Sequence, residues 1–163
     1  MDEGRRIISL IDEFPKPVVA ALNGAARAEG AALALACDLR IARPEAMLAL
    51  DFVRDGMAPA WGASATVARL AGEGTALDLL WTGRCIDATQ AQALGLVERV
   101  SDSFDEEVAA LCDSLGSADP NLLHLTRMAV QSSHACDLAD SLDLETEIQH
   151  RNWSEGRRRT ARR

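Results

Sequence analysis

Three acidic side chains and one arginine within the first 55 residues have the types and spacing that could do chemistry. Glu29 stands at the start of a helix of small residues, two positions after Arg27, and Asp51 and Asp55 follow a short apolar strand. Positioned carboxylates can accept or donate protons in general acid–base catalysis. A helix N-terminus favours an anion, because its first backbone N–H groups have no partner within the helix. These residues therefore indicate a possible site for a reaction that builds up negative charge.

Each of these residues also has a structural interpretation. A glutamate in the first turn of a helix stabilises that helix by a few tenths to about 1 kcal/mol, so Glu29 is either structural or chemical. Asp51 and Asp55 are interpreted as exposed loop aspartates, with Arg54 or Arg27 as possible ion-pair partners. The alternative for either aspartate is a proton shuttle.

Other kinds of site find little support. The cysteines are far apart and form no CxxC pair, which argues against a metal or disulfide framework; they are Cys37, Cys85, Cys112 and Cys136. No histidine motif lies near Ser64 or Thr66 to activate a nucleophile. There is no apolar run long enough for a bilayer, and the N-terminus lacks the apolar core of a signal peptide. We expect a reduced cytoplasmic protein without a metal and without membrane association.

The net charge of −8 is unevenly distributed. The residues from Arg151 onward carry +5 and the rest of the chain carries −13. An acidic body argues against nucleic-acid binding, because phosphate contacts need a basic face. The arginine-rich end is interpreted as a solubilising tail, with contact to RNA or a phosphate as the alternative.

The apolar pattern predicts an α/β region followed by an all-helical region. Strands are expected where short buried runs end at turn residues, namely 18–22, 39–42, 47–50 and 96–100. Helices are expected at 5–14, 28–37, 63–70, 75–81, 105–115, 120–132 and 138–153, and one more begins at Asp87 with the capping-box spacing to Gln90 and ends at Gly95. The segment 51–62 is predicted to be a loop. We expect residues 1–104 to form a core domain and residues 105–163 a helical region with a basic tail.

Three stretches together resemble the crotonases, the superfamily of enoyl-CoA hydratases and isomerases. They are "KPVVAALNG" (16–24), "LALACDLRIA" (33–42) and "WTGRCIDATQAQALGLVERV" (81–100), followed late in the chain by "SEG" (154–156). Their order and spacing match the family without large gaps from 16 to 100. The resemblance implies an α/β fold, a partial crotonase-like β-β-α spiral that lacks the family's N-terminal portion, followed by an α-helical C-terminal region.

The family stabilises the enolate of an acyl-CoA thioester, and it does so with two backbone N–H groups, one of them at a helix N-terminus. The resemblance places the family's three glycines on Ala28, Glu29 and Gly30, and therefore the oxyanion N–H on Glu29. It places the two hydratase glutamates on Ala32 and Phe52, so neither carboxylate is present.

The remaining site residues follow from the same resemblance. Catalytic roles would fall to Glu29, Asp51 or Asp55, and substrate binding to Arg27, Gly30, Ala60 and Trp61. Trp61 is expected either to fill pocket volume or to pack in the core. Arg27 and Glu29 are expected to bind the ligand or to close the pocket mouth by pairing with each other or with a neighbouring subunit.

Two functions stay open. The chain is either an acyl-CoA enzyme of hydratase/isomerase type with a degenerate site, or a catalytically silent crotonase-like subunit with an assembly or binding role. Coenzyme A would be part of the substrate and no separate cofactor is implied. Self-association as a trimer or hexamer is expected from the family and from the apolar residues of 120–132.

Overall fold

The structure is a computed structural model that describes residues 2–160, with the side chains of residues 3–153. It divides into two compact units, Met1–Asp113 and Ser114–Arg163. The division falls inside helix α6 (Phe104–Ser117), whereas the expected domain boundary, between 104 and 105, lies at the start of this helix.

The first unit contains two small sheets. The first sheet has the order β1-β3-β6 with all strands parallel, and these strands are β1 (Val19–Leu22), β3 (Leu39–Ala42) and β6 (Arg99–Val100). The second has the order β2-β4-β5, made of β2 (Ala25–Arg27), β4 (Met47–Ala49) and β5 (Cys85–Asp87). In it β2 and β4 are parallel and β5 is antiparallel to β4. The chain thus passes from the first sheet to the second through the turn at Asn23–Gly24.

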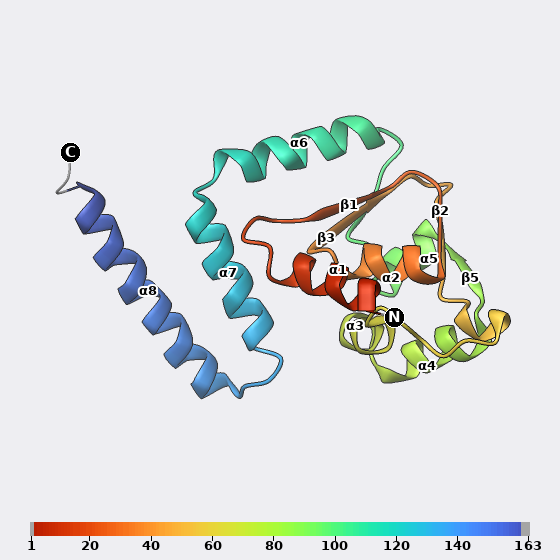
Figure 1. The fold of residues 1–163 in the computed structure, drawn as a ribbon. Coiled ribbons are helices and arrows are strands. Elements are labelled where there is room, and N and C mark those ends of the chain that lie inside the picture. Colours follow the sequence, from red (N-terminus) through yellow and green to blue (C-terminus); the bar gives the residue numbers. More distant parts are fainter. Residues whose placement is uncertain (1, 161–163) are drawn as a thin grey trace. The chain divides into compact units, whose positions relative to one another are not determined.

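Helix α2 (Ala28–Ala36) is the centre of this unit, because its residues are small or apolar and most are buried. It contacts α1 (Asp2–Asp12), β2 and α3 (Ala63–Ala71). Figure 1 shows α2 beside α1 and the strands that precede it. Helices α4 (Glu73–Thr82) and α5 (Ala88–Ala93) contribute further residues to the same core. A helix with apolar residues on most of its faces is expected to be buried in this way.

Most of the predicted elements are confirmed, with shifted ends. The helix expected at 5–14 runs over Asp2–Asp12, and the strand expected at 96–100 is confined to Arg99–Val100. The capping box at Asp87 is present: the backbone N–H of Gln90 donates to Asp87 Oδ1 at 2.8 Å, and that of Asp87 donates to Gln90 Oε1 at 3.2 Å. The expected loop at 51–62 contains a 3-10 helix, η1 (Phe52–Asp55).

Two strands were not predicted. β2 and β5 have three residues each, and both lie directly before a helix, so their apolar pattern is too short to distinguish from a loop. Their pairing with β4 makes them strands. Residues 25–27, which the sequence left unassigned, therefore form a strand that ends at Arg27, directly before α2.

The second unit contains a helical hairpin. Helices α7 (Pro120–Ser132) and α8 (Leu138–Thr160) lie side by side and antiparallel (Figure 1). Asp119 caps α7, because its Oδ1 accepts a hydrogen bond from the N–H of Asn121 at 2.8 Å. The side chains of the basic tail lie outside the described residues. In the part of the chain that the structure describes, no helix is both long and apolar enough to cross a membrane.

The packing of α1 rests on a glycine. A Cβ added at Gly4 would lie 2.5 Å from Cε2 and 2.7 Å from Cδ1 of the Trp61 indole, so α1 and this ring meet where Gly4 has no side chain. We predict that Gly4→Ala lowers the free energy of unfolding by about 1–3 kcal/mol, because an added methyl overpacks the contact. The control is Gly74→Ala, at a helical glycine of α4 whose added Cβ meets nothing within 4 Å. Chemical denaturation of the two variants measures the difference, and equal stabilities would contradict the packing of Trp61 on Gly4.

Candidate functional site

The candidate site begins at the N-terminus of α2. Arg27 is the N-cap residue, has an extended backbone (φ −129°, ψ 151°) and gives the helix no side-chain cap. Ala28, the first helical residue, has φ 43°, in the left-handed region. This conformation costs an L-residue about 1–2 kcal/mol, and glycine adopts it freely. Ala28 is the position where the resemblance places the first glycine of the crotonases. Its backbone has a conformation that glycine would adopt without strain, although the residue is alanine.

The side chain of Arg27 pairs with Asp51. The Nε of Arg27 donates to Asp51 Oδ2 at 2.8 Å, and Nη2 donates to the same oxygen in a short contact. The Arg27 side chain is 66% exposed, whereas Asp51 is 2% exposed. The other oxygen, Oδ1, is buried and has no hydrogen-bond partner among the described residues. The expectation that Asp51 is an exposed loop aspartate is therefore wrong, while its pairing with Arg27 is confirmed.

Strand register explains this pairing. β2 and β4 are parallel, with Arg27 opposite Ala49, and Asp51 follows two residues after Ala49. The carboxylate therefore emerges beside the residue that ends β2 and caps α2. The expected pairing of Arg27 with Glu29 is replaced by this pair, because Glu29 has already entered the helix. Arg54, the other side chain proposed as a partner for Asp51, instead donates to the carbonyl of Thr82 at 3.4 Å.

The ion pair favours the charged form of both partners, because it raises the pKa of Arg27 and helps to lower the pKa of Asp51. Burial is the largest influence and raises the pKa of Asp51, but the hydrogen bond and charge of Arg27 together with backbone N–H groups outweigh it, so the pKa of Asp51 is lowered. The hydrogen bond to Asp51 raises the pKa of Arg27, and the charge of Asp55 adds to this rise. Asp51 is thus a carboxylate at neutral pH and a weak proton acceptor.

The two hydratase positions are occupied by core residues. Ala32 is 1% exposed and Phe52 is fully buried, and both belong to the hydrophobic core. Phe52 begins η1, and the exposed Asp55 ends it before Gly56, whose φ is 69°. Neither Ala32 nor Phe52 can hold or move a proton. The carboxylates that remain accessible are Asp55, which is exposed, and Glu29, which is half-buried.

The other predicted site residues are spread over two elements. Gly30 is exposed in the first turn of α2. Ala60 and Trp61 are half-buried, precede α3 and pack against the core. Trp61 and Gly62 have φ values of 54° and 72°, so two successive residues of this turn are in the left-handed region. The packing of Trp61 agrees with a core role, the second of its two interpretations.

One neighbour of the site, Cys85, could not be predicted from the sequence. Ala49 pairs with Arg27 on one side and with Cys85 of β5 on the other, so Cys85 lies across the sheet from Arg27. Cys85 is exposed, and its thiolate would interact favourably with the Arg27 guanidinium. Only the unpredicted strand β5 brings it here. The described residues contain no group of three or more histidine, cysteine, aspartate or glutamate side chains that could hold a metal.

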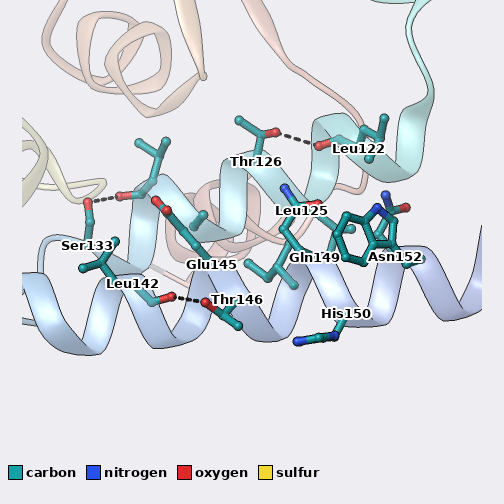
Figure 2. A pocket seen from close by; sticks show the side chains of 14 residues that line it. Leu122, Leu125, Thr126, Ser133, Leu142, Glu145, Thr146, Gln149, His150 and Asn152 are labelled. Carbon is teal, nitrogen blue, oxygen red and sulfur yellow. Dashed lines mark hydrogen bonds between the residues drawn. The ribbon is translucent and has the colours of Figure 1, made fainter.

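A second hollow lies in the helical hairpin. A groove of about 660 Å³ runs between α7 and α8, with apolar side chains such as Leu122, Leu125 and Leu142 and polar ones such as Gln149 and Asn152. Figure 2 shows these side chains and the hydrogen bonds that Thr126 and Thr146 donate to backbone carbonyls within their own helices. These two hydroxyls are satisfied locally, so the groove combines apolar side chains with the polar groups of Glu145, Gln149, His150 and Asn152.

Known proteins match nearly all of this chain. The family described as enoyl-CoA hydratase/isomerase matches residues 2–162. YngF of Bacillus subtilis, named as a candidate enoyl-CoA hydratase/isomerase, is 38% identical over 86% of this chain and 55% of its own length. The short-chain-enoyl-CoA hydratase of Clostridium acetobutylicum is 30% identical over 88% of this chain and 56% of its own length. The chain thus spans about half the length of these relatives.

Solved structures agree with the sequence matches. An enoyl-CoA hydratase of Bacillus anthracis has a TM-score of 0.86 and 32% identity over 91% of this chain and 58% of its own. A candidate enoyl-CoA hydratase of Thermobifida fusca, solved in complex with CoA, has a TM-score of 0.82 and 30% identity over 86% of this chain and 55% of its own. With its parallel strands, its α2 helix and these matches, the chain belongs to the enoyl-CoA hydratase/isomerase family and has a partial crotonase fold.

Proposed function

We propose that this chain binds an acyl-CoA thioester at the N-terminus of α2, in a degenerate site of the enoyl-CoA hydratase/isomerase type. The observation that carries this proposal is the burial of Ala32 and Phe52 in the core, where the crotonase pattern has its two glutamates. Family membership and the CoA complex of a relative support the ligand class. Coenzyme A is then part of the substrate.

The backbone N–H of Glu29 is the proposed donor to the thioester oxygen. A backbone N–H survives the replacement of glycine by glutamate, and the positive end of the helix dipole favours a developing negative charge. Asp51 is held by Arg27 and is a weak base. Asp55 and Glu29 are therefore the proposed proton carriers, and one carboxylate suits the movement of a proton between two carbons better than the addition of water.

The second candidate function is that of a silent subunit. Exposed apolar side chains on α7 and α8 favour it, because they offer surface for assembly; they include Leu122, Val130, Leu142 and Trp153. Isomerisation of a 3-enoyl-CoA to a 2-enoyl-CoA separates the two functions. Activity that falls in Asp55→Asn or Glu29→Gln would identify the proton carrier, and absence of activity together with self-association would favour the silent subunit.

We predict that hydration of crotonyl-CoA is absent or very slow. A general acid or base contributes about 10²–10⁴-fold to a rate, and both hydratase carboxylates are missing. Loss of the enoyl-thioester absorbance at saturating substrate measures the reaction, with a hydratase that carries both glutamates as the control. A turnover near the ordinary enzyme rate of about 10 s⁻¹ would contradict the placement of Ala32 and Phe52 at the hydratase positions.

We further predict self-association, as a trimer or a dimer of trimers, through the apolar groove of α7 and α8. Leu142→Glu places a charge in this groove and should shift the protein to a smaller species, because burying an unpaired charge is costly. Leu138→Glu is the matched control, since Leu138 is exposed on the same helix but does not line the groove. Light scattering at micromolar concentration measures both variants. A compact monomer in the unmodified protein would contradict self-association.

A further inference from the structure

The N-terminus of α2 already faces an anion that belongs to the chain itself. Arg27 caps the helix without a side-chain hydrogen bond to it, and Asp51 follows by two residues Ala49, the β4 residue that pairs with Arg27. Asp51 is 2% exposed and is held through Oδ2 by Arg27 Nε at 2.8 Å. A carboxylate fixed at this point stands where an external anion would be attracted by the helix.

Backbone groups at the helix start favour the ionised carboxylate. Burial raises the pKa of Asp51, whereas the Arg27 hydrogen bond and, to a smaller extent, the N–H groups of Asp51 and of Ala28, the first residue of α2, lower it. The net result is a full negative charge at neutral pH beside the first N–H of the helix. No side chain of the helix itself fills this place, because Arg27 carries the opposite charge.

Two further carboxylates lie near the pair. Asp55 of η1 interacts with Arg27, and Glu29 lies in the first turn of α2. The Arg27 guanidinium is already bound to Asp51, and Arg54 of η1 donates to the carbonyl of Thr82. The Asp51 carboxylate would therefore already neutralise part of the positive potential at the N-terminus of α2 when an oxyanion of a ligand approaches.

We propose that Asp51 is an internal inhibitor that occupies the positive end of α2 and competes with the thioester oxygen of an acyl-CoA. Arg27 positions this carboxylate by holding it against the start of the helix. The proposal rests on the proposed function, since it needs the α2 N-terminus to be the place of thioester binding. It assigns to Asp51 the opposite role from that of a catalytic base.

The test compares Asp51→Asn with wild type in calorimetric titrations with acetyl-CoA. Removing the charge should tighten binding about tenfold, since a charge at a helix end acts on an anion by up to about that factor. Glu45→Gln is the matched control, because it removes the same charge from an exposed position before β4 and should change the affinity about twofold or less. Free CoA lacks the thioester oxygen and should bind Asp51→Asn and wild type equally.

The outcomes separate this proposal from the proposed function. Binding by wild type that is equal to, or tighter than, binding by Asp51→Asn overturns the internal inhibitor and leaves the proposed function intact. If neither wild type nor any variant binds acetyl-CoA, the proposed function is wrong, and the proposal that Asp51 is an internal inhibitor is wrong as well. Should Asp51→Asn fail to fold, the double variant Arg27→Gln/Asp51→Asn removes both charges while keeping a possible neutral hydrogen bond, and the same gain in affinity is expected.

A second measurement needs no ligand. Because the pKa of Asp51 is lowered on folding, its contribution to stability is present above the unfolded value of about 3.9 and is lost as pH falls through the lowered value. The difference in melting temperature between wild type and Asp51→Asn should therefore be smaller at about pH 3 than at about pH 7. A difference that does not change with pH would contradict an ionised Asp51 at the helix start and would overturn the proposal.

Discussion

The burial of α2 is the constraint on which the first unit depends. Both ends of a buried helix expose backbone groups that have no partner in the helix, and these groups must be satisfied away from water. In this chain each end meets an arginine–carboxylate pair from the surrounding strands and loops. Arg27 and Asp51 stand at the N-terminus, and Arg40 and Glu98 stand at the C-terminus.

The two pairs are arranged with opposite polarity. At the C-terminus the buried Arg40 donates through Nη1 to the carbonyls of Leu35 at 3.2 Å and Cys37 at 2.7 Å, and Glu98 binds the other side of the guanidinium. The cation is thus nearest to the negative end of the helix. At the N-terminus the buried partner is Asp51, so the anion is nearest to the positive end. Each arrangement follows the sign of the helix dipole.

This arrangement bears directly on function. In a site built on a helix N-terminus, the potential that stabilises an oxyanion is the same potential that attracts an internal carboxylate. Burying Asp51 at this point stabilises α2 and takes up part of the field that a ligand would use. Together with the apolar Ala32 and Phe52, this arrangement supports the proposed degenerate site, in which structural stability is favoured over proton transfer.

The sequence by itself determined the family, the buried character of α2, most helix positions and the absence of carboxylates at Ala32 and Phe52. These features depend on local patterns: small residues in a row, turn residues at fixed spacing, and the type of residue at an aligned position. The capping box of Asp87 and Gln90 was equally predictable, because three residues of sequence contain the whole interaction.

The burial of Asp51, the strands β2 and β5, and the approach of Cys85 to Arg27 were decided only by the tertiary structure. Three-residue strands have no periodicity of their own, and they form because β4 provides backbone partners on both sides. The partner of Arg27 could not be read from spacing, since Glu29 lies only two residues away in sequence whereas Asp51 lies 24 residues away. Parallel register between β2 and β4 makes the choice, because it alone brings the end of one strand and the carboxylate after the other to the same level, where burial then requires the charge to be paired.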